Sequence, residues 1–311
     1  MKKYYDLIIK DTRFGSYIHR FLIRRYYNFL SLLNDKQFAV FLFNKNFSFK
    51  LNLDNPRSLN EKIQWLKLFE RTELHTLCAD KFKVRGYVQK KLGSDNILIP
   101  LLYDTDCSED LTPGNLPNTP MILKTNHTSG HYHIVRKPET CDWDSIRADF
   151  SKWLTENIYS TRREWQYKNI PPRIVVEKLL VDEAGNVPDD FKFHCFHGEV
   201  KFFQVDMGRG TETHNRNWYN TDWTRTNFDW KSKFKSGYTE VVDADVEIPK
   251  NFDAMLKIAE ILSQDFKYVR VDLYNHLGEI YFGEITFHHD GGFKPIIPVE
   301  YDFKLGDLLK L

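Results

Sequence analysis

The sequence has few cysteines, no long apolar run and almost no net charge, and each shortage excludes a class of protein. Its four cysteines form neither a CxxC motif nor a cluster with histidine, so a structural zinc site is disfavoured and reduced thiols in the cytosol are expected. No run approaches the roughly 20 apolar residues of a membrane span, and the first residues lack a signal-peptide pattern. A net charge of +1 gives no general affinity for nucleic acid.

Several catalytic motifs are missing as well. The chain contains no GxxxxGK[ST] phosphate loop, no GxSxG motif and no Cys/His nucleophile pattern, which disfavours P-loop NTPases and acyl-enzyme hydrolases. His131 and His133 would share one face of a strand, yet no third ligand at zinc spacing accompanies them. Internal repeats and low-complexity segments are also absent from the sequence.

The charge that is present is unevenly distributed. Residues 1–50 contain ten Lys or Arg against three Asp, a balance of +7, so the rest of the chain carries about −6. Apolar residues interleave with these basic ones over residues 1–46, which predicts helix. Such a helix can contact an anionic membrane surface or a biosynthetic complex, or it can pack on the main domain with its arginines in water. Both interpretations stay open.

The strongest positive signal is a predicted β-hairpin near the C-terminal end. Residues 268–274 and 280–286 each alternate with period two, and residues 275–278 between them are turn formers. This register sets two carboxylates opposite each other at roughly 5 Å, where they repel. An Mg²⁺ or Mn²⁺ ion between them would remove the repulsion, whereas the alternative is two acids on a solvated face. The predicted pairs are Tyr274 with Phe282, Asp272 with Glu284, and Arg270 with Thr286.

Two other segments have features of a nucleotide site. Residues 121–124 form an apolar strand that ends in Lys124, and the loop at 125–130 supplies hydroxyls, glycine and backbone N–H groups that can hold phosphate. The apolar run at 174–180 is typical of a buried strand, whose backbone can pair with a flat heterocycle. An ordinary hairpin turn and an ordinary core strand are the alternatives.

The remaining pattern predicts alternating helices and strands. A capping box of Ser58 and Glu61 begins one helix, and Gly93 is the expected C-cap of another. Residues 208–250 carry three tryptophans without a regular period and are predicted to be long connecting loops. The other predicted elements are helices at 77–92, 142–159 and 252–266, strands at 97–102 and 132–135, and a hairpin over 191–196 and 200–205.

The order of these segments resembles the ATP-grasp superfamily, and in particular its teichuronopeptide-biosynthesis-type amidoligase branch. The resemblance covers residues 55–311, its last motif is specific, and the earlier ones gain weight from their order. The matching phrases are SLNEKIQWLKL (58–68), DKFKVRGYV (80–88), the strand ending at Lys124, IVVEKLL (174–180), DDFKFHCFHGEV (189–200) and VRVDLYNHLGEIYFGEITF (269–287).

This resemblance implies an α+β fold in which two subdomains clamp a nucleotide. It places a helical lead-in at 55–96, a central subdomain at about 97–172 and a C-terminal subdomain at about 173–311, after a basic helical segment at 1–54. Many relatives have asparagine two residues after the metal-binding glutamate, whereas this chain has Thr286, which puts the number of direct ligands and of metal ions in doubt.

The resemblance also assigns roles to individual residues. The general base for an attacking amine would be His288, His289 or Asp290, and the loop at 125–130 would be a lid. The implied contacts are Lys81 and Lys124 with phosphates, covered by Thr128, Ser129 and Gly130; Glu177, Lys178 and Leu180 with adenine; Asp190 and Lys192 with ribose or phosphates; Arg270 with the transferring phosphoryl group; and Asp272, Glu284 and Thr286 with Mg²⁺.

The implied activity is an ATP- and Mg²⁺-dependent carboxylate–amine ligase. We expect it to join an amino acid or another amine to a sugar carboxylate in cell-surface polysaccharide synthesis, in the cytoplasm or at the inner face of the membrane. A glycosyltransferase and a non-catalytic nucleotide- or glycan-binding module are the alternatives. Trp218, Trp223 and Trp230 suit sugar stacking and a packed loop core equally well.

Overall fold

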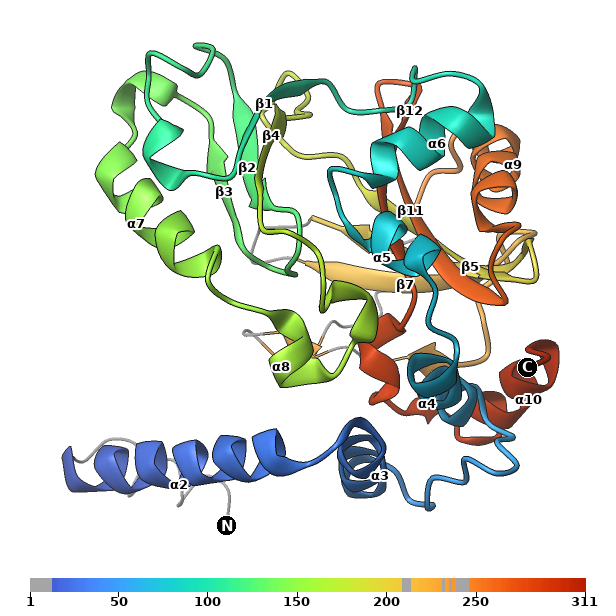
Figure 1. The fold of residues 1–311 in the computed structure, drawn as a ribbon. Helices are drawn as coiled ribbons and strands as arrows, with labels where there is room; N and C mark the ends of the chain where they lie inside the picture. The colour runs from blue at the N-terminus through green and yellow to red at the C-terminus, as the bar shows by residue number, and fades with distance from the viewer. Residues whose placement is uncertain (1–12, 209–213, 231–232, 235–236, 239–245) are drawn as a thin grey trace. The chain divides into compact units, whose positions relative to one another are not determined.

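The structure is a computed structural model that describes residues 13–208, 214–230, 233–234, 237–238 and 246–311 (Figure 1). The chain divides into two compact units, Met1–Lys50 and Leu51–Leu311. Each unit is described by itself. Within the described residues, no helix combines the length and the apolarity needed to cross a bilayer.

The first unit consists of two helices, α2 (Arg13–Leu32) and α3 (Asp35–Asn46). Asn34 begins α3 through a capping box, because its side chain accepts a hydrogen bond from Gln37 N at 2.9 Å while the Gln37 side chain accepts one from Asn34 N at 3.1 Å. The buried side of α3 carries Phe38 and Phe43. The predicted helix is therefore confirmed over 13–46 with one break, and residues 1–12 lie outside the described part.

The second unit contains two main sheets. The smaller sheet has four antiparallel strands in the order β1-β4-β2-β3, and helix α7 packs against its apolar face in a cluster with Met121, Leu123 and Phe150 (Figure 1). The bounds are β1 Leu101–Thr105, β2 Met121–Thr125, β3 Tyr132–Val135, β4 Ile174–Lys178 and α7 Trp143–Trp153. Strand β4 belongs to this sheet, so the two sheets separate after residue 178, whereas the predicted boundary lay near 172.

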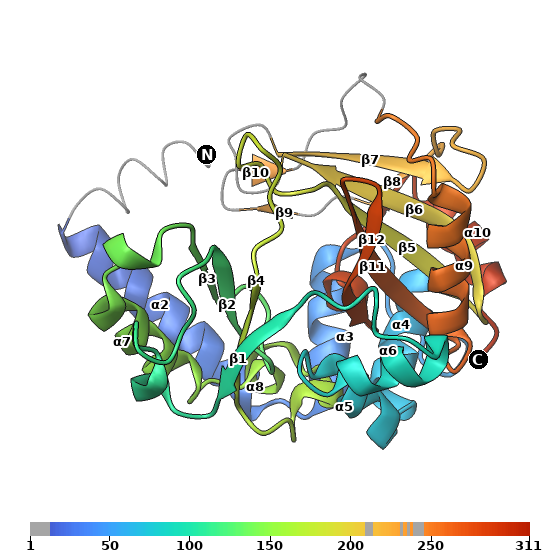
Figure 2. The ribbon, with the colours of Figure 1, turned by 90° about the horizontal axis from the view of Figure 1, so that it is seen from above.

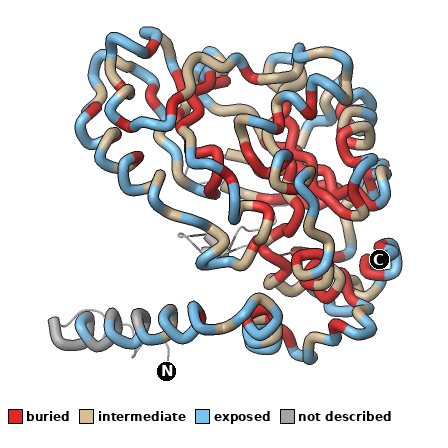
Figure 3. The backbone as a smooth tube through the Cα atoms, viewed as in Figure 1, coloured by how far each residue is buried: buried red, intermediate tan, exposed pale blue. Residues whose placement is uncertain are grey.

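The larger sheet has five antiparallel strands in the order β12-β11-β5-β6-β7. One face is apolar and packs on helices α9 and α6 around Phe193, Val271 and Met255 (Figure 2). Many buried residues of the unit lie along these strands and helices (Figure 3). The bounds are β5 Asp190–Phe196, β6 Glu199–Met207, β7 Asn215–Asn220, β11 Tyr268–His276, β12 Glu279–Thr286, α6 Val84–Leu92 and α9 Phe252–Ser263.

Shorter elements surround the two sheets. The capping box of Ser58 and Glu61 is confirmed at the start of α4, and Gly93 ends α6 in the left-handed conformation with φ 68°. The other elements are α4 Leu59–Phe69, α5 Glu73–Ala79, α8 Ile158–Arg162, α10 Glu300–Leu308, β8 Asp229–Trp230, β9 Lys233–Phe234, β10 Gly237–Tyr238 and β13 Ile296–Ile297, with 3-10 turns at Ser108–Asp110, Pro138–Thr140, Trp165–Tyr167 and His289–Gly292.

Four predicted boundaries are wrong. The helix at 77–92 is two helices, because the Asp80 carboxylate accepts hydrogen bonds from the N–H groups of Phe82 and Lys83 and ends α5. The helix at 142–159 stops at Trp153, and the strand predicted at 97–102 lies at 101–105. Residues 208–250 are not all loop: β7 forms the edge of the larger sheet, paired to β6.

The hairpin is confirmed, but one predicted pair is wrong. Asp272 lies opposite Glu284 and Arg270 opposite Thr286, while Tyr274 pairs with Tyr281 instead of Phe282. The cause is a β-bulge at Gly283, which adds one residue to β12 between these two parts of the ladder.

Candidate active site

The polar face of the larger sheet carries a cluster of charged side chains around Arg270. The Arg270 guanidinium binds Asp272 with both ends, from Nε to Oδ1 at 2.6 Å and from Nη2 to Oδ2 at 2.7 Å. Its Nη2 also reaches Glu284 Oε1 and Thr286 Oγ1, each at 3.0 Å. Arg270 and Asp272 are both buried. Strands β11 and β12 thus bring the four predicted residues together as a single network.

A lysine on the neighbouring strand completes this network. Lys192 Nζ lies 2.6 Å from Asp272 Oδ2 and is also paired with Asp190, and all three side chains are buried. The ladder explains the arrangement, because Asp272 on β11 stands directly opposite Lys192 on β5. The two predicted ribose or phosphate residues therefore sit one strand away from the predicted metal ligands.

Glu284 is the most accessible carboxylate of the group. Its side chain is 42% exposed, against 1% for Asp272. Burial raises the pKa of Glu284, but the charges of Arg270, Lys81 and Lys192 outweigh burial and bring the pKa down to about 2. Glu284 is therefore ionised at any physiological pH.

Lys81 lies in the break between α5 and α6, next to the Asp80 carboxylate that ends α5. Asn126 fixes this break, because its side chain donates to Asp80 Oδ1 at 2.9 Å and its carbonyl accepts from Lys81 N at 3.2 Å. The Lys81 ammonium donates to the carbonyl of Thr128. Burial lowers the pKa of Lys81 to about 8, partly offset by the charge of Glu284 and reinforced by that of Lys124. Lys81 therefore interacts electrostatically with a charge on each sheet, Glu284 on the larger one and Lys124 on the smaller one.

Lys124 on β2 is held by Glu177 on β4. Lys124 Nζ lies 2.6 Å from Glu177 Oε2, and Arg85 Nη1 lies 3.3 Å from Glu177 Oε1. Arg85 also donates to the carbonyl of Ile99 at 2.9 Å. Sequence reasoning missed Arg85, because a basic residue on a helix gives no sign of the strand that it will face. This region therefore contains the two predicted lysines, Lys81 and Lys124, and one cation that was not predicted, Arg85.

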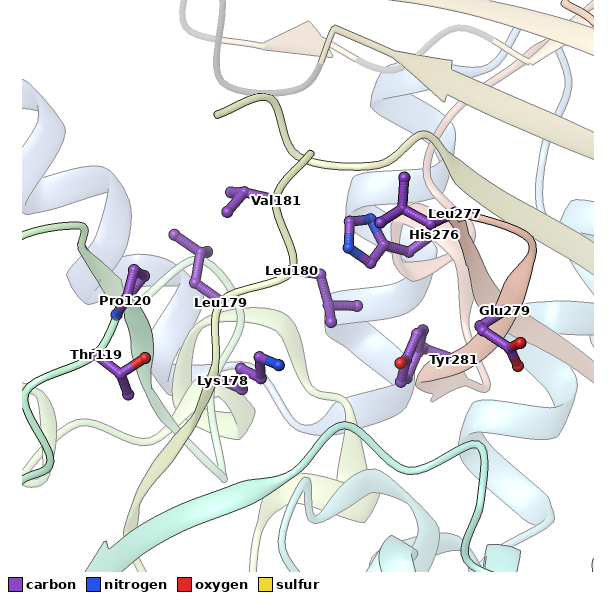
Figure 4. A pocket seen from close by; sticks show the side chains of 10 residues that line it. All are labelled: Thr119, Pro120, Lys178, Leu179, Leu180, Val181, His276, Leu277, Glu279 and Tyr281. Atoms are coloured by element: carbon purple, nitrogen blue, oxygen red, sulfur yellow. The ribbon is translucent and has the colours of Figure 1, made fainter. Parts of the chain in front are cut away.

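A cavity of about 420 Å³ lies at the end of β4, where Lys178 is among its lining residues (Figure 4). The segment after β4 lines one side of it, and the tip of the β11–β12 hairpin lines another. Lys178 and Leu180, both predicted adenine contacts, are among its lining residues, whereas Glu177 is not. The lining residues are Thr119, Pro120, Lys178, Leu179, Leu180, Val181, His276, Leu277, Glu279 and Tyr281.

A family model described as TupA-like ATP-grasp matches residues 61–310. The chain belongs to this family. The predicted resemblance and the predicted ATP-grasp fold are thereby confirmed. A comparison with curated protein sequences gave no match.

Solved structures of other ATP-grasp enzymes are similar to this TupA-like chain. D-alanine–D-alanine ligase from Bacillus anthracis has 14% identity and a TM-score of 0.38, over 68% of this chain and 57% of that one. ATP-grasp ligase PsnB, complexed with a phosphomimetic variant of its minimal precursor, Mg and ADP, has 10% identity and a TM-score of 0.39, over 74% and 58%. The chain therefore spans a little over half of the length of each of these proteins.

The hydroxyl and glycine loop of the TupA-like chain is anchored at its base and open at its tip. Thr125 and Thr128 share a hydrogen bond between their hydroxyls, and Thr128 Oγ1 lies 3.1 Å from His131 Nδ1. Ser129 and Gly130 are exposed, and Gly130 adopts a positive φ of 85°. The arrangement agrees with a loop whose tip can approach a ligand, and its role as a lid stays a prediction.

The donor set on β11 and β12 suits a hard divalent cation. Mg²⁺ is usually held by one or two carboxylates and completed by substrate phosphates and water. Asp272 and Glu284 are the two facing carboxylates, and Thr286 Oγ1 donates to Glu284 Oε1 at 2.9 Å, so the threonine orients the glutamate. In the described residues no group of three His, Cys, Asp or Glu side chains could hold an ion alone. A metal here would depend on oxygen atoms from a bound phosphate.

The two histidines after β12 are buried and differ in their contacts. His289 Nδ1 accepts a hydrogen bond from Arg270 Nη1 at 2.7 Å, and the His289 ring lies edge-on to Trp230 with 4.4 Å between the centroids. Among the residues that the structure describes, His288 Nδ1 has no hydrogen-bond partner. Burial lowers the pKa of both imidazoles well below the usual range. Neutral imidazoles are compatible with the predicted general base, a role that stays a prediction for His288, His289 and Asp290.

The three tryptophans considered for sugar stacking are packed instead. Trp218 and Trp230 are buried in a cluster with Phe202 and Tyr268, and Trp230 Nε1 donates to the carbonyl of Lys294 at 2.8 Å. Trp223 packs against Phe203 on the apolar side of the sheet. These rings therefore serve the core of the unit, which decides between the two interpretations of the sequence.

Proposed function

We propose that the protein is an ATP- and Mg²⁺-dependent carboxylate–amine ligase. One observation carries the proposal. A pair of facing carboxylates on β11 and β12 forms one charge network with Arg270. The Lys81 ammonium interacts electrostatically with this network and with Lys124. Anionic phosphates and a divalent cation would balance such a group of charges.

The proposed binding mode follows from where these groups lie. The purine would occupy the cavity formed by the segment after β4 and the hairpin tip, with Lys178 and Leu180 offering backbone groups and Tyr281 an apolar wall. The triphosphate would extend toward Lys124 and Lys81. Asp272 and Glu284 would hold Mg²⁺, which neutralises phosphate charge when bound.

The chemistry needs alignment and charge stabilisation more than a protein nucleophile. A substrate carboxylate oxygen would attack the γ-phosphorus, the bond from that phosphorus to the β,γ-bridging oxygen would break, and ADP would leave. An amine would then attack the acyl carbon of the acylphosphate. Inorganic phosphate would leave with the electron pair of the C–O bond, and a base would take the proton of the amine. Arg270, fixed by Asp272, is positioned to stabilise the charge of the first step.

We further propose that the carboxylate belongs to a uronic-acid sugar and that the amine is an amino acid or a related compound. The support is the resemblance of residues 55–311 to amidoligases of cell-surface polysaccharide synthesis. We also propose that the protein works in the cytoplasm or attaches peripherally to the inner face of the membrane through residues 1–50, whose charge balance is +7, from ten basic against three acidic residues.

The test is acceptor-dependent release of ADP. Purified protein with ATP, Mg²⁺ and pairs of uronic acids and amino acids should release ADP and phosphate only when both substrates are present. Asp272→Asn and Glu284→Gln should each lower turnover by at least about 100-fold. Glu199→Gln, an exposed acid at the β5–β6 turn, is the matched control and should leave turnover unchanged. Consumption of a nucleotide sugar without ADP release would contradict the proposal and favour a glycosyltransferase.

A further inference from the structure

Helix α2 presents an apolar surface that the described residues of its own unit leave exposed. Leu32 is 83% exposed and Tyr17 is 69% exposed, although both are large apolar residues. At about 100° per residue, the exposed apolar residues fall within an arc of roughly 140° on the helix. The members of this arc are Tyr17, Phe21, Leu22, Phe29 and Leu32, with Arg25 among them.

The arc lies mainly away from α3. Helix α3 meets α2 around Leu30, a buried residue of α2, and through Tyr26, whose ring lies 6.5 Å from that of Phe41. Phe29, a member of the arc, also contacts Phe41, at 5.3 Å. In Figure 3 the described residues of α2 are mostly coloured as exposed. The packing among the described residues of the first unit therefore does not account for these exposed apolar side chains.

The charge of α2 indicates what could cover the arc. The helix has four arginines and no acidic residue. Positions 13, 20 and 24, all arginine, fall on a strip of roughly 40° that borders the arc at Tyr17, and Arg25 lies over the Phe21 ring at 5.7 Å. A helix with an apolar arc beside a basic strip fits the boundary between an apolar layer and an anionic surface. A bilayer containing acidic phospholipids has that composition.

We infer that α2 lies in the interface of an anionic membrane, with its apolar arc in the acyl region and its arginines at the lipid phosphates. The inference concerns the first unit and does not depend on the ligase activity proposed for the second. It would hold the active site close to a substrate carried on a lipid.

The test is co-sedimentation of the full-length protein with vesicles. Vesicles of phosphatidylglycerol and phosphatidylcholine should bind it, and vesicles of phosphatidylcholine alone should bind it much more weakly. Replacing Arg20, Arg24 and Arg25 by Gln should weaken binding by about 100-fold, since each basic residue near an anionic surface contributes roughly fivefold. The matched control replaces the exposed Lys36, Lys50 and Lys152 by Gln, removes the same charge and should change binding much less.

A second pair of variants tests the apolar arc. Phe21→Gln with Leu22→Gln should reduce vesicle binding by at least tenfold, whereas Phe69→Gln, an equally exposed apolar residue of α4, should not. Circular dichroism checks that each variant stays folded. Equal binding to neutral vesicles, or unchanged binding in both α2 variants, would overturn the inference. So would a dimer in light scattering that only Phe21→Gln/Leu22→Gln dissociates, because a second copy would then cover the arc.

Discussion

Most N–H groups of Arg270 donate hydrogen bonds that hold its side chain in place. Its Nε and Nη2 hydrogens go to Asp272, Glu284 and Thr286, and one Nη1 hydrogen goes to His289. The second Nη1 hydrogen has no acceptor in the described part of the chain. In the proposed reaction this N–H is the one available to a phosphoryl oxygen, and its direction is set by the His289 imidazole.

His289 therefore has a second possible role, as a positioning residue. His289→Phe keeps the ring against Trp230 but removes the acceptor, so we expect kcat to fall by about 10- to 100-fold with little change in ATP affinity. His289→Asn places an oxygen where Nδ1 stands and should retain most of the activity. Steady-state kinetics and ATP binding measure the two effects. An equal loss in both variants would instead support His289 as the general base.

The lowered pKa of Lys81 gives a pH dependence to nucleotide capture. Above a pKa of about 8 the free protein loses the ammonium charge, so kcat/KM for ATP should fall as pH rises through 8. Lys81→Arg keeps its charge at all accessible pH values and should move this fall to higher pH. The measurement is kcat/KM from pH 6 to 10, and Lys83→Arg, two residues on and exposed, is the control. A wild-type profile without an alkaline fall would contradict the assignment.

At the scale of single elements, the β-bulge at Gly283 decides which face Glu284 occupies. In a ladder that continued from Leu273 and Phe282 without a bulge, Glu284 would pair with Val271 and turn toward the apolar face. Glycine suits this position, because an added Cβ would lie 3.0 Å from the Asp272 carbonyl oxygen and 3.1 Å from the Tyr274 ring. The sequence alone does not reveal the bulge, since the alternation on either side of it looks continuous.

A methyl group at the bulge should disturb the pairing of the acids. In Gly283→Ala we expect the Mg²⁺ concentration for half-maximal turnover to rise several-fold, with a loss of stability of about 1–2 kcal/mol from the close contacts. Titration of turnover with Mg²⁺ and urea unfolding measure these effects. Gly86→Ala is the control, because its Cβ would have no neighbour within 4 Å and helix α6 would gain a better helix former. Unchanged Mg²⁺ dependence in Gly283→Ala would show that the bulge is not needed.

The other differences between predicted and observed elements share one cause. Each of these features depends on residues that are distant in the sequence. The capping box at Ser58 uses residues three apart and was predictable. The break at Asp80 depends on Asn126, which follows β2, and the pairing of Arg85 with Glu177 depends on how α6 meets β4. Strand β7 was missed because Arg216 and Asn217 are both buried in it, so polar residues face both sides and hide the alternation.

At the scale of the second unit, its last helix, α10, packs against its first helix, α4. Asp302 on α10 accepts hydrogen bonds from the backbone N–H and side-chain amide of Asn60 on α4, at 2.9 and 3.0 Å, across 242 residues of sequence. Lys62 also donates to the carbonyls of Gly306 and Leu309. Gly306 allows this approach, because an added Cβ would meet the Arg57 carbonyl oxygen at 2.0 Å. The two ends of the unit are therefore joined, and both contribute side chains to the apolar cluster that contains Trp230.

The contact between α4 and α10 makes the free energy of unfolding depend on pH. Burial raises the pKa of Asp302 from 3.8 to about 6, so between these values the folded protein binds a proton that the unfolded chain has released. The free energy of unfolding should therefore fall as pH rises from about 4 to about 6, by up to about 3 kcal/mol. Asp302→Asn should flatten this dependence and be more stable than the wild type at pH 7, because Asn60 Oδ1, which has no partner in the described part of the chain, can accept from the new amide. Urea unfolding from pH 4 to 7 measures this, with Glu300→Gln, exposed on the same helix, as the control. An equal slope in Asp302→Asn and wild type would assign the pH dependence to other groups.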